Sequence, residues 1–318
     1  MGCVIVNVGA WVLAVPLLAW TAVRLVGEER GTPSVQLMAF TPYVAVLAVL
    51  VTVAVAATGR LAAAGACAFA AVALVGGVVR RVLPSGRPDA AAPAVTLRVM
   101  TANVLIGRAD AADLVRQVKI EEVDVLAVQE LTFDCLDGLD EAGIGELLPH
   151  RIANPTKRWE GSAVFSRHPI SDTAIRPLGT GRHTQAAATV TVPGGPAVRV
   201  ESAHPCAPRR GYTGEWRAGL ATQPAAPDGG LPRILMGDFN ATLDHGSLRR
   251  LLATGYRDAA AERGAGLVPT WPFLRYRVPP VTLDHILVSE PITVASVAVR
   301  PILGSDHRAV VAEVRLPS

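Results

Sequence analysis

Gly304-Ser305-Asp306-His307 stands near the C-terminus, and Gly237-Asp238-Phe239-Asn240 and Leu283-Asp284-His285 precede it. Each motif lies at the end of an apolar, strand-like run or just after one. Carboxylate, amide and imidazole side chains that emerge from strand ends are typical of a site that binds a metal ion and a phosphate group. The same pattern recurs upstream at Asn103, Glu130 and His204.

The N-terminal quarter of the chain is strongly apolar. Residues 4–26, 37–57 and 61–79 form three runs, each near the roughly 20 residues that a helix needs to cross a bilayer. Arg24 and Arg60 are the only charged residues inside these runs or at their edges. A secretory signal peptide fits less well, because the first run lacks a basic leader and is too long. Since three such runs in succession favour transmembrane helices over buried core helices, we expect a three-helix anchor over residues 1–83.

The excess of basic over acidic residues in the chain lies in this anchor and in the start of the linker that follows it. The chain has 30 Lys and Arg and 27 Asp and Glu residues. The part from Pro88 onward retains 24 basic and 25 acidic residues, so it is nearly neutral. Proteins that gather nucleic acid through counterion release normally have a basic face. The sum therefore disfavours a nucleic-acid partner, although it does not exclude local basic patches.

The cysteines do not have the spacing of a metal site. Cys3, Cys67, Cys135 and Cys206 are far apart, so we expect no zinc centre and interpret them as apolar core residues. A disulfide between Cys135 and Cys206 stays open on the sequence alone.

The remaining chain predicts one folded domain. Residues 84–94 are rich in Pro, Ser, Gly and Ala and are expected to form a linker, with the catalytic domain over residues 95–318. The domain begins with a strand at 96–102, an amphipathic helix at 110–122 and a buried strand at 124–128. Two packed sheets with helices outside, an α+β fold with four αββα layers, suit this pattern best. Further strands are predicted at 162–166, 186–192, 197–203, 233–236, 283–288, 294–300 and 309–316, and a helix at 248–253.

Each candidate site residue also has a plain structural interpretation. Glu130 follows a buried strand, where carboxylates bind Mg²⁺, but taken alone it fits a solvated loop residue better. Asp238 and Asn240 are two apart, so in extended chain both face one side and offer a base for water and a donor to phosphate. Alternatively they form an Asx turn. Asp284 can fix the tautomer of His307, and the flanking apolar strands make a mere surface turn less plausible.

Taken together, the motifs resemble the endonuclease/exonuclease/phosphatase superfamily, whose fold is DNase I-like. The resemblance covers residues 95–316 and rests on several ordered matches. Besides the three C-terminal motifs, these are Met100-Thr101-Ala102-Asn103, Val128-Gln129-Glu130, Ser166-Arg167-His168-Pro169 and Ser202-Ala203-His204-Pro205.

The resemblance implies a role for each matched residue. Asn103 and Glu130 would bind Mg²⁺ (or Mn²⁺) or phosphate, and Asp306 would lie near the metal. His204 would bind phosphate and stabilise the leaving group. Asp238 and Asn240 would lie at the scissile phosphate, and Asp284 would orient His307. Glu160 resembles the acidic partner of the first catalytic histidine in the DNase I branch.

The chain also departs from the DNA-repair members of this superfamily. The DNA-binding segment of abasic-site endonucleases has no counterpart, and Arg209, Arg210 and Trp216 occupy that region. A DNA-repair role is therefore disfavoured. Trp271 and the aromatic, basic stretch at 273–277 form either a substrate rim or a packed surface corner. We expect Arg209, Arg210 and Trp271 to contact substrate.

An anchor of a few helices before this domain is similar to VanJ-type teicoplanin-resistance membrane proteins of actinomycetes. That likeness implies an extracytoplasmic phosphatase acting on undecaprenyl-type lipid pyrophosphates. The positive-inside rule places the catalytic domain in the cytoplasm instead. With three spans, the first loop and the domain share one side of the membrane, and that side carries Arg24, Arg30, Arg80, Arg81 and Arg87, whereas the other side carries only Arg60. A start codon assigned too far downstream would reconcile the two.

The sequence thus predicts a membrane-anchored, Mg²⁺-dependent phosphoesterase whose substrate is lipid-linked. Three alternatives stay open: a nonspecific nuclease, a phospholipid or sphingolipid phosphodiesterase, and a catalytically silent binding module. The oligomeric state is not predicted.

Overall fold

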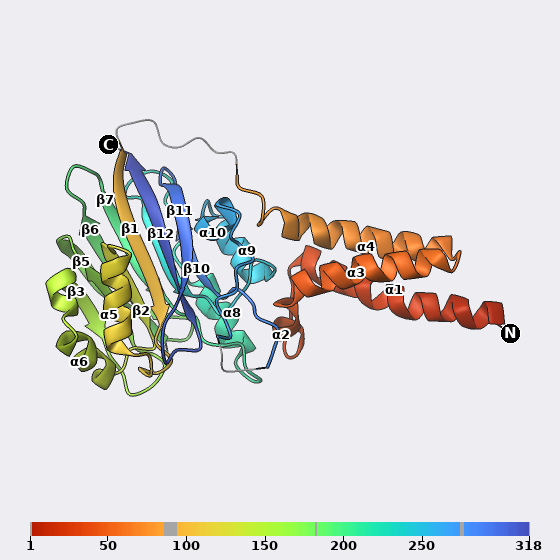
Figure 1. Ribbon diagram of the computed structural model, residues 1–318, viewed down its shortest axis with the longest axis horizontal. Coiled ribbons are helices and arrows are strands. Elements are labelled where there is room, and N and C mark those ends of the chain that lie inside the picture. Colours follow the sequence, from red (N-terminus) through yellow and green to blue (C-terminus); the bar gives the residue numbers. More distant parts are fainter. Residues whose placement is uncertain (1, 86–93, 182, 274–276, 318) are drawn as a thin grey trace.

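The computed structural model describes residues 2–85, 94–181, 183–273 and 277–317. Two six-stranded sheets pack face to face, and helices cover their outer faces (Figure 1). A bundle of apolar helices, α1 to α4, projects from one side of this domain.

The first sheet has the strand order β11-β12-β1-β2-β4-β3. β1 and β2 are parallel and flank the helix α5, whereas the other neighbours are antiparallel. Its strands are β1 (Ala94–Asn103), β2 (Val125–Gln129), β3 (His150–Asn154), β4 (Ser162–Ser166), β11 (Thr293–Pro301) and β12 (Arg308–Pro317).

The second sheet repeats this plan, with the order β5-β6-β7-β8-β10-β9 and one parallel pair, β7 and β8. Its strands are β5 (Ile170–Leu178), β6 (His183–Thr191), β7 (Ala197–Ala203), β8 (Arg233–Asp238), β9 (Arg257–Asp258) and β10 (Asp284–Val288). The predicted two-sheet sandwich is therefore confirmed.

Alternation along the strands divides the apolar side chains between two layers of core. On β1, Leu97 and Val99 face the space between the sheets, while Met100 and Ala102 face the helices. A further cluster lies beneath α8 and α9. The helices of the domain are α5 (Ala111–Ile120), α6 (Phe133–Glu141), α7 (Ile144–Leu147), α8 (Thr213–Ala221), α9 (Gly246–Leu252) and α10 (Ala259–Glu262).

The apolar N-terminal segment forms four helices: α1 (Gly2–Val26), α2 (Ser34–Met38), α3 (Thr41–Ala57) and α4 (Leu61–Val79). Two of them, α1 and α4, are long and apolar enough to cross a membrane. The expected middle span at 37–57 is interrupted, because the chain leaves α2 at Ala39 and starts α3 beside Pro42. At 17 residues, α3 is about 26 Å long, short of the roughly 30 Å hydrocarbon core. The expected three full spans are therefore not confirmed, and two helices, α1 and α4, are candidates to cross a membrane.

A buried ion cluster holds these helices against the domain. Asp244, which is fully buried, accepts from Arg24 Nε at 2.7 Å and from Arg81 Nη2 at 2.6 Å. Arg24 lies in the last turn of α1 and Arg81 just after α4, so one carboxylate joins both helices. Beside it, a Cβ on Gly246 would lie 2.1 Å from the carbonyl oxygen of Gly27, so the backbones touch directly. We call these five residues the anchor junction.

The open question about the cysteines is answered for the described residues. Cys135 and Cys206 are buried free thiols, and so is Cys67. Burial raises the pKa of Cys135 and of Cys206 to about 11, which keeps both protonated and unreactive at neutral pH.

Candidate active site

The site lies where the parallel strands of both sheets end. Asn103 is the last residue of β1, Asp238 is the last of β8, and the carboxyl ends of parallel neighbours meet at one edge of a sheet. The antiparallel strands begin at the same edge, so Asp284 pairs directly with Asp238. Glu130 and His204 lie one residue beyond β2 and β7, and His307 lies one residue before β12. The topology thus brings together residues that are remote in sequence.

An amide connects two of the acidic residues. Asn103 Nδ2 donates to Glu130 Oε1 at 3.2 Å and to Asp238 Oδ2 at 3.1 Å. The other Glu130 oxygen accepts from Ile106 N at 2.8 Å. Ile106 has φ +51° and Glu130 has φ +61°, conformations that are costly for side chains with a Cβ. The fold holds this strained loop in place, and the strain aims a backbone N–H at the carboxylate.

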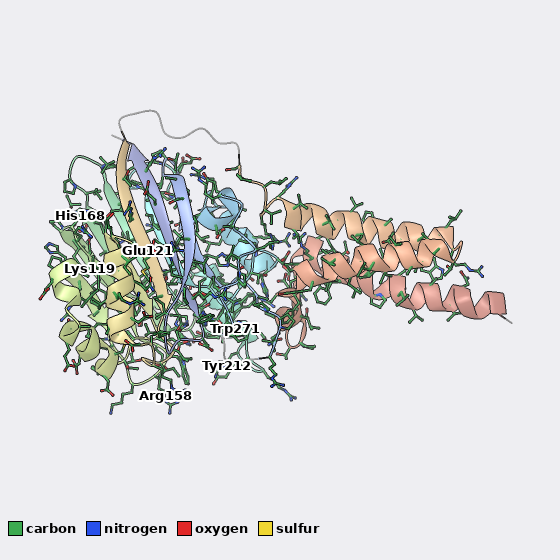
Figure 2. The ribbon with its side chains drawn as sticks, viewed as in Figure 1. Lys119, Glu121, Arg158, His168, Tyr212 and Trp271 are labelled. Atoms are coloured by element: carbon green, nitrogen blue, oxygen red, sulfur yellow. The ribbon has the colours of Figure 1, made fainter. Side chains whose placement is uncertain are left out.

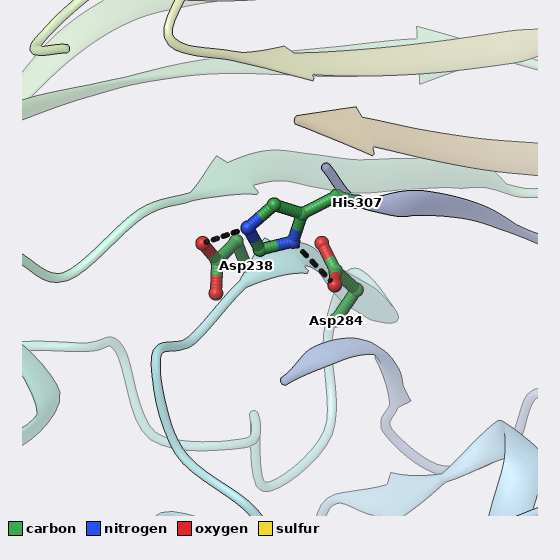
Figure 3. Close-up of side chains that lie close together, drawn as sticks. All are labelled: Asp238, Asp284 and His307. Carbon is green, nitrogen blue, oxygen red and sulfur yellow. Dashed lines mark hydrogen bonds and ion pairs between the residues drawn. The ribbon is translucent and has the colours of Figure 1, made fainter. Parts of the chain in front are cut away.

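His307 lies between two aspartates (Figure 3). Its Nδ1 is 2.9 Å from Asp284 Oδ2, and its Nε2 is 3.7 Å from Asp238 Oδ2. Burial alone would lower the pKa of His307, but attraction by Asp284 and Asp238 outweighs it and raises the pKa to about 10. At neutral pH the ring is therefore a cation that donates from both nitrogens.

His204 has the opposite electrostatic character. Its Nε2 lies 3.7 Å from Glu130 Oε1 and 3.8 Å from Asp238 Oδ2. Burial lowers the pKa of His204 to about 4, against the attraction of Asp238. Burial also raises the pKa of Asp238 to about 6, against the attraction of His307. The site therefore holds a protonated histidine, a neutral histidine and a carboxylate whose pKa is near the operating pH of a general base.

The donor set fits a divalent cation. Glu130, Asp238, Asp284 and Asp306 outnumber the one protonated imidazole, so a phosphate group meets an excess of negative charge unless a cation is bound. Asp306 Oδ1 is buried and has no hydrogen-bond partner among the described residues. Burial raises the pKa of Glu130, and repulsion from Asp306 adds to that rise. Oxygen ligands of this kind suit a hard cation such as Mg²⁺.

Geometry alone would also allow a metal among Asp238, Asp284 and His307, whose ligand atoms lie within 4.8 Å of one another. Ligation of a metal through His307 Nδ1 would break the contact of that nitrogen with Asp284. Glu130, Asp306 and Asn103 could hold a cation without disturbing that contact.

A cavity of about 490 Å³ gives access to this cluster. Polar side chains line one part of it, among them Glu130, Asp238 and His307. The other part is apolar and includes residues of the N-terminal helices and of the loop before β10: Val35, Ala39, Phe40, Val278, Val281 and Leu283.

A family model described as the Endonuclease/Exonuclease/phosphatase family matches residues 100–307. The chain belongs to this family. It is accordingly a hydrolase of phosphoester bonds. No curated protein matches the chain significantly.

Solved structures of the family share the fold. An endonuclease/exonuclease/phosphatase from Beutenbergia cavernae is 20% identical, with 70% of this chain and 72% of that chain covered and a TM-score of 0.55. A humanized D. rerio TDP2 is 17% identical, with 69% and 98% covered and a TM-score of 0.56. The human Nocturnin catalytic domain with bound sulfate is 20% identical, with 70% and 95% covered and a TM-score of 0.51. At these identities the likeness supports the fold alone.

The remaining residues that the sequence predicted for the site do not all lie at the cavity. Trp271 and Arg209 line the cavity, and Trp271 Nε1 donates to Asp306 Oδ2 at 3.3 Å. Arg210 is exposed and Glu160 is half-buried, and neither is among the residues that line the cavity. Glu160 accepts from Thr156 Oγ1 at 3.4 Å, whereas the carboxylates near His204 are Glu130 and Asp238. The contacts of Glu160 therefore give its predicted role no support.

Asn240 combines both interpretations of its motif. Its backbone N–H donates to Asp238 Oδ1 at 2.8 Å, as in an Asx turn, with φ +48°. Its side-chain Nδ2 donates to Pro205 O at 3.0 Å, and the residue also lines the cavity. The turn thus fixes the Asp238 carboxylate while it keeps Asn240 at the site.

Some cavity residues were not expected from the sequence. His183, Trp159 and Tyr212 line it, and His183 is near enough to lower the pKa of His204 further. His183 lies three residues before the strand predicted at 186–192, so no predicted element included it, whereas the observed β6 begins there. Nothing in the sequence indicated that Val35 and Phe40, from the N-terminal segment, would reach the same cavity.

Proposed function

We propose that the protein is a membrane-anchored phosphoesterase that depends on Mg²⁺ or Mn²⁺. Its substrate is a phosphate or pyrophosphate ester presented at the membrane surface, with an undecaprenyl-type lipid pyrophosphate as the leading candidate. One observation carries the proposal: a single cavity joins the charged cluster at His307 to apolar side chains of the N-terminal helices.

The residues divide the chemistry among them. A divalent cation held by Glu130, Asp306 and Asn103 would neutralise charge on the phosphate group. His307, positioned by Asp284 through Nδ1, donates a hydrogen bond from Nε2 to a non-bridging oxygen as a fixed cation. Asp238 orients and deprotonates the attacking water, since its raised pKa suits a base near neutral pH.

The departing oxygen needs a donor of its own. His204 is neutral, so its single N–H can be donated to that oxygen without adding a full charge to the site. The hydrolysis itself is in-line displacement: a water oxygen forms a bond to phosphorus, and the P–O bond to the leaving group breaks, which in a pyrophosphate is the anhydride bond. The leaving oxygen keeps the electron pair and accepts the hydrogen bond of His204, and the proton of the water passes to Asp238.

Membrane attachment is supported by the exposed surface of the helical bundle. Large apolar side chains on α1, α3 and α4 face outward, including Val12, Leu50 and Val72, each more than 60% exposed. Such a contiguous apolar surface marks a membrane or protein interaction site. The anchor junction keeps the cavity next to this surface, and so favours substrates at the bilayer.

The side of the membrane is proposed to be extracytoplasmic, by likeness to VanJ-type proteins. Arg24 and Arg81, which count toward a cytoplasmic domain under the positive-inside rule, both pair with Asp244. The single carboxylate of Asp244 therefore neutralises one of these two positive charges within the protein.

A substrate panel tests the proposal. The full chain in detergent, with Mg²⁺, is offered a prenyl pyrophosphate, a phospholipid and plasmid DNA. Release of phosphate from the prenyl pyrophosphate, abolished by EDTA, is the expected result. Cleavage of DNA alone, falling steeply as salt rises, would replace the proposal with a nuclease.

A further inference from the structure

The short helix α2 and the start of α3 form a wall of the catalytic cavity. Val35, Ala39 and Phe40 line the same cavity as Asp238 and His307, although they lie in the segment that precedes the catalytic domain. Val35 is fully buried and packs in the cluster beneath α8 and α9. This wall is therefore part of the domain's packed structure rather than a loosely placed neighbour.

Direct contacts fix the wall in position. His245 Nε2 lies 2.8 Å from Val35 O, and the N–H of Thr242 donates to His245 Nδ1 at 2.9 Å, so Nε2 carries the proton given to Val35. Tyr43, in the first turn of α3, donates to Pro280 O at 2.7 Å in the loop that carries Val278 and Val281. This hydrogen bond connects the wall to the loop that faces it. The apolar part of the cavity lies between them.

The position of this apolar part of the cavity indicates what fills it. The cavity extends from the phosphate-handling residues to Val35, Ala39 and Phe40 of the N-terminal segment. Trp271 and Tyr212, which also line it, lie on the side of the domain that faces the helical bundle (Figure 2). A sugar-phosphate chain leaving the site would place polar groups against Val35, Phe40 and Val281, whose side chains offer no hydrogen bonds. Among the described residues of this wall, Gln36 is the one polar side chain that lines the cavity. An aliphatic chain attached to the phosphate suits the same surface.

Resting on the proposed function, we infer that α2 and Phe40 form a binding site for the aliphatic chain of the substrate, so that the membrane segment itself determines substrate specificity. The chain lies between this wall and Val278, with the phosphate at His307. Each buried methylene then raises affinity by roughly fourfold.

Chain-length selectivity provides the test. The full chain in one detergent is given isopentenyl and geranylgeranyl pyrophosphate, which share a head group, and the ratio of their kcat/KM values is measured. Phe40→Ser and Val278→Ser should each lower the preference for the long chain by about tenfold. Leu37→Ser is the matched control, because Leu37 is an exposed residue of α2 outside the cavity lining and should keep the ratio. An unchanged ratio in both cavity variants, with hydrolysis intact, overturns the inference and leaves the proposed function standing.

A binding readout separates the two proposals. A non-hydrolysable alkyl phosphonate with a diazirine at the end of its chain is photo-crosslinked to the protein, and the labelled peptides are mapped. Labelling of residues 35–40 or of Val278, displaced by geranylgeranyl pyrophosphate, supports the wall even if no pyrophosphate is hydrolysed. Labelling confined to the outward faces of α1, α3 and α4 means that the probe reports only bulk insertion, and rejects it.

Discussion

His307 Nδ1 and Asp284 Oδ2 lie 2.9 Å apart, both buried, at the start of two strands that belong to different sheets. This contact joins the two sheets at the edge where the site lies, and it helps to keep the imidazole protonated. The catalytic proposal therefore depends on a carboxylate that would not itself touch substrate.

Removing the charge of Asp284 tests this dependence. Asp284→Asn should lower kcat by about 10²- to 10⁴-fold, because the ring of His307 loses both its orientation and the attraction that raises its pKa. Histidine NMR titration should show the pKa of His307 falling from about 10 toward its ordinary value. His168→Gln is the control, since His168 lies on the far side of the domain from Trp271 (Figure 2). Full activity in Asp284→Asn would exclude this role.

The position of the cation gives a second prediction. Asp306→Asn should weaken Mg²⁺ binding at least about tenfold in calorimetry, since it removes the charge behind the unpaired oxygen of Asp306. Asp134→Asn, an exposed residue in the first turn of α6, should bind Mg²⁺ as the parent does. If affinity is lost with Asp284→Asn and kept with Asp306→Asn, the metal lies instead among Asp238, Asp284 and His307.

The pH profile follows from the two shifted groups that act on water and phosphate. Asp238 must be ionised to accept a proton, and its pKa is raised to about 6, so kcat/KM should fall as the pH drops through about 6. His307 must be protonated, and its pKa is about 10, so activity should fall again only above about 10. A profile measured with a substrate that does not titrate between these values checks both limbs. Constant activity from pH 7 down to pH 4 would rule out Asp238 as the base.

The anchor junction predicts a large stability effect. Asp244→Ala leaves Arg24 and Arg81 buried without their shared partner, which should cost about 3–5 kcal/mol of unfolding free energy. Asp140→Ala breaks an ion pair with Arg151 in which both side chains are 41% exposed, and should cost about 0–1 kcal/mol. Denaturant titration followed by tryptophan fluorescence compares the two, and equal losses would show that the junction does not stabilise the domain.

The interior strands of the fold could be predicted from sequence, and among the edge strands only the apolar β11 could. Central strands such as β4 and β7 are continuous or alternating apolar runs, and their predicted bounds agree with the structure. The missed strands β3, β5 and β9 all lie at sheet edges. Edge strands bury less, so their sequences are polar or carry a proline, as at Pro177, and resemble loops.

The site divides in the same way. Motifs at strand ends identified Asn103, Glu130, Asp238 and His307, because strand ends converge once the sheet topology is known. Contacts between distant segments had no local signal. Asp244 is 220 residues from Arg24, and the wall at Val35 meets the cavity only through tertiary packing. The role predicted for Glu160 rested on spacing alone, which does not determine where a loop side chain points.

The most direct test of the account is release of phosphate from a prenyl pyrophosphate by the full chain, with Mg²⁺ and with EDTA, beside His307→Ala. We predict Mg²⁺-dependent release that EDTA abolishes and that the substitution lowers by at least about 10³-fold. Release that continues unchanged in EDTA and in His307→Ala would contradict the central claim.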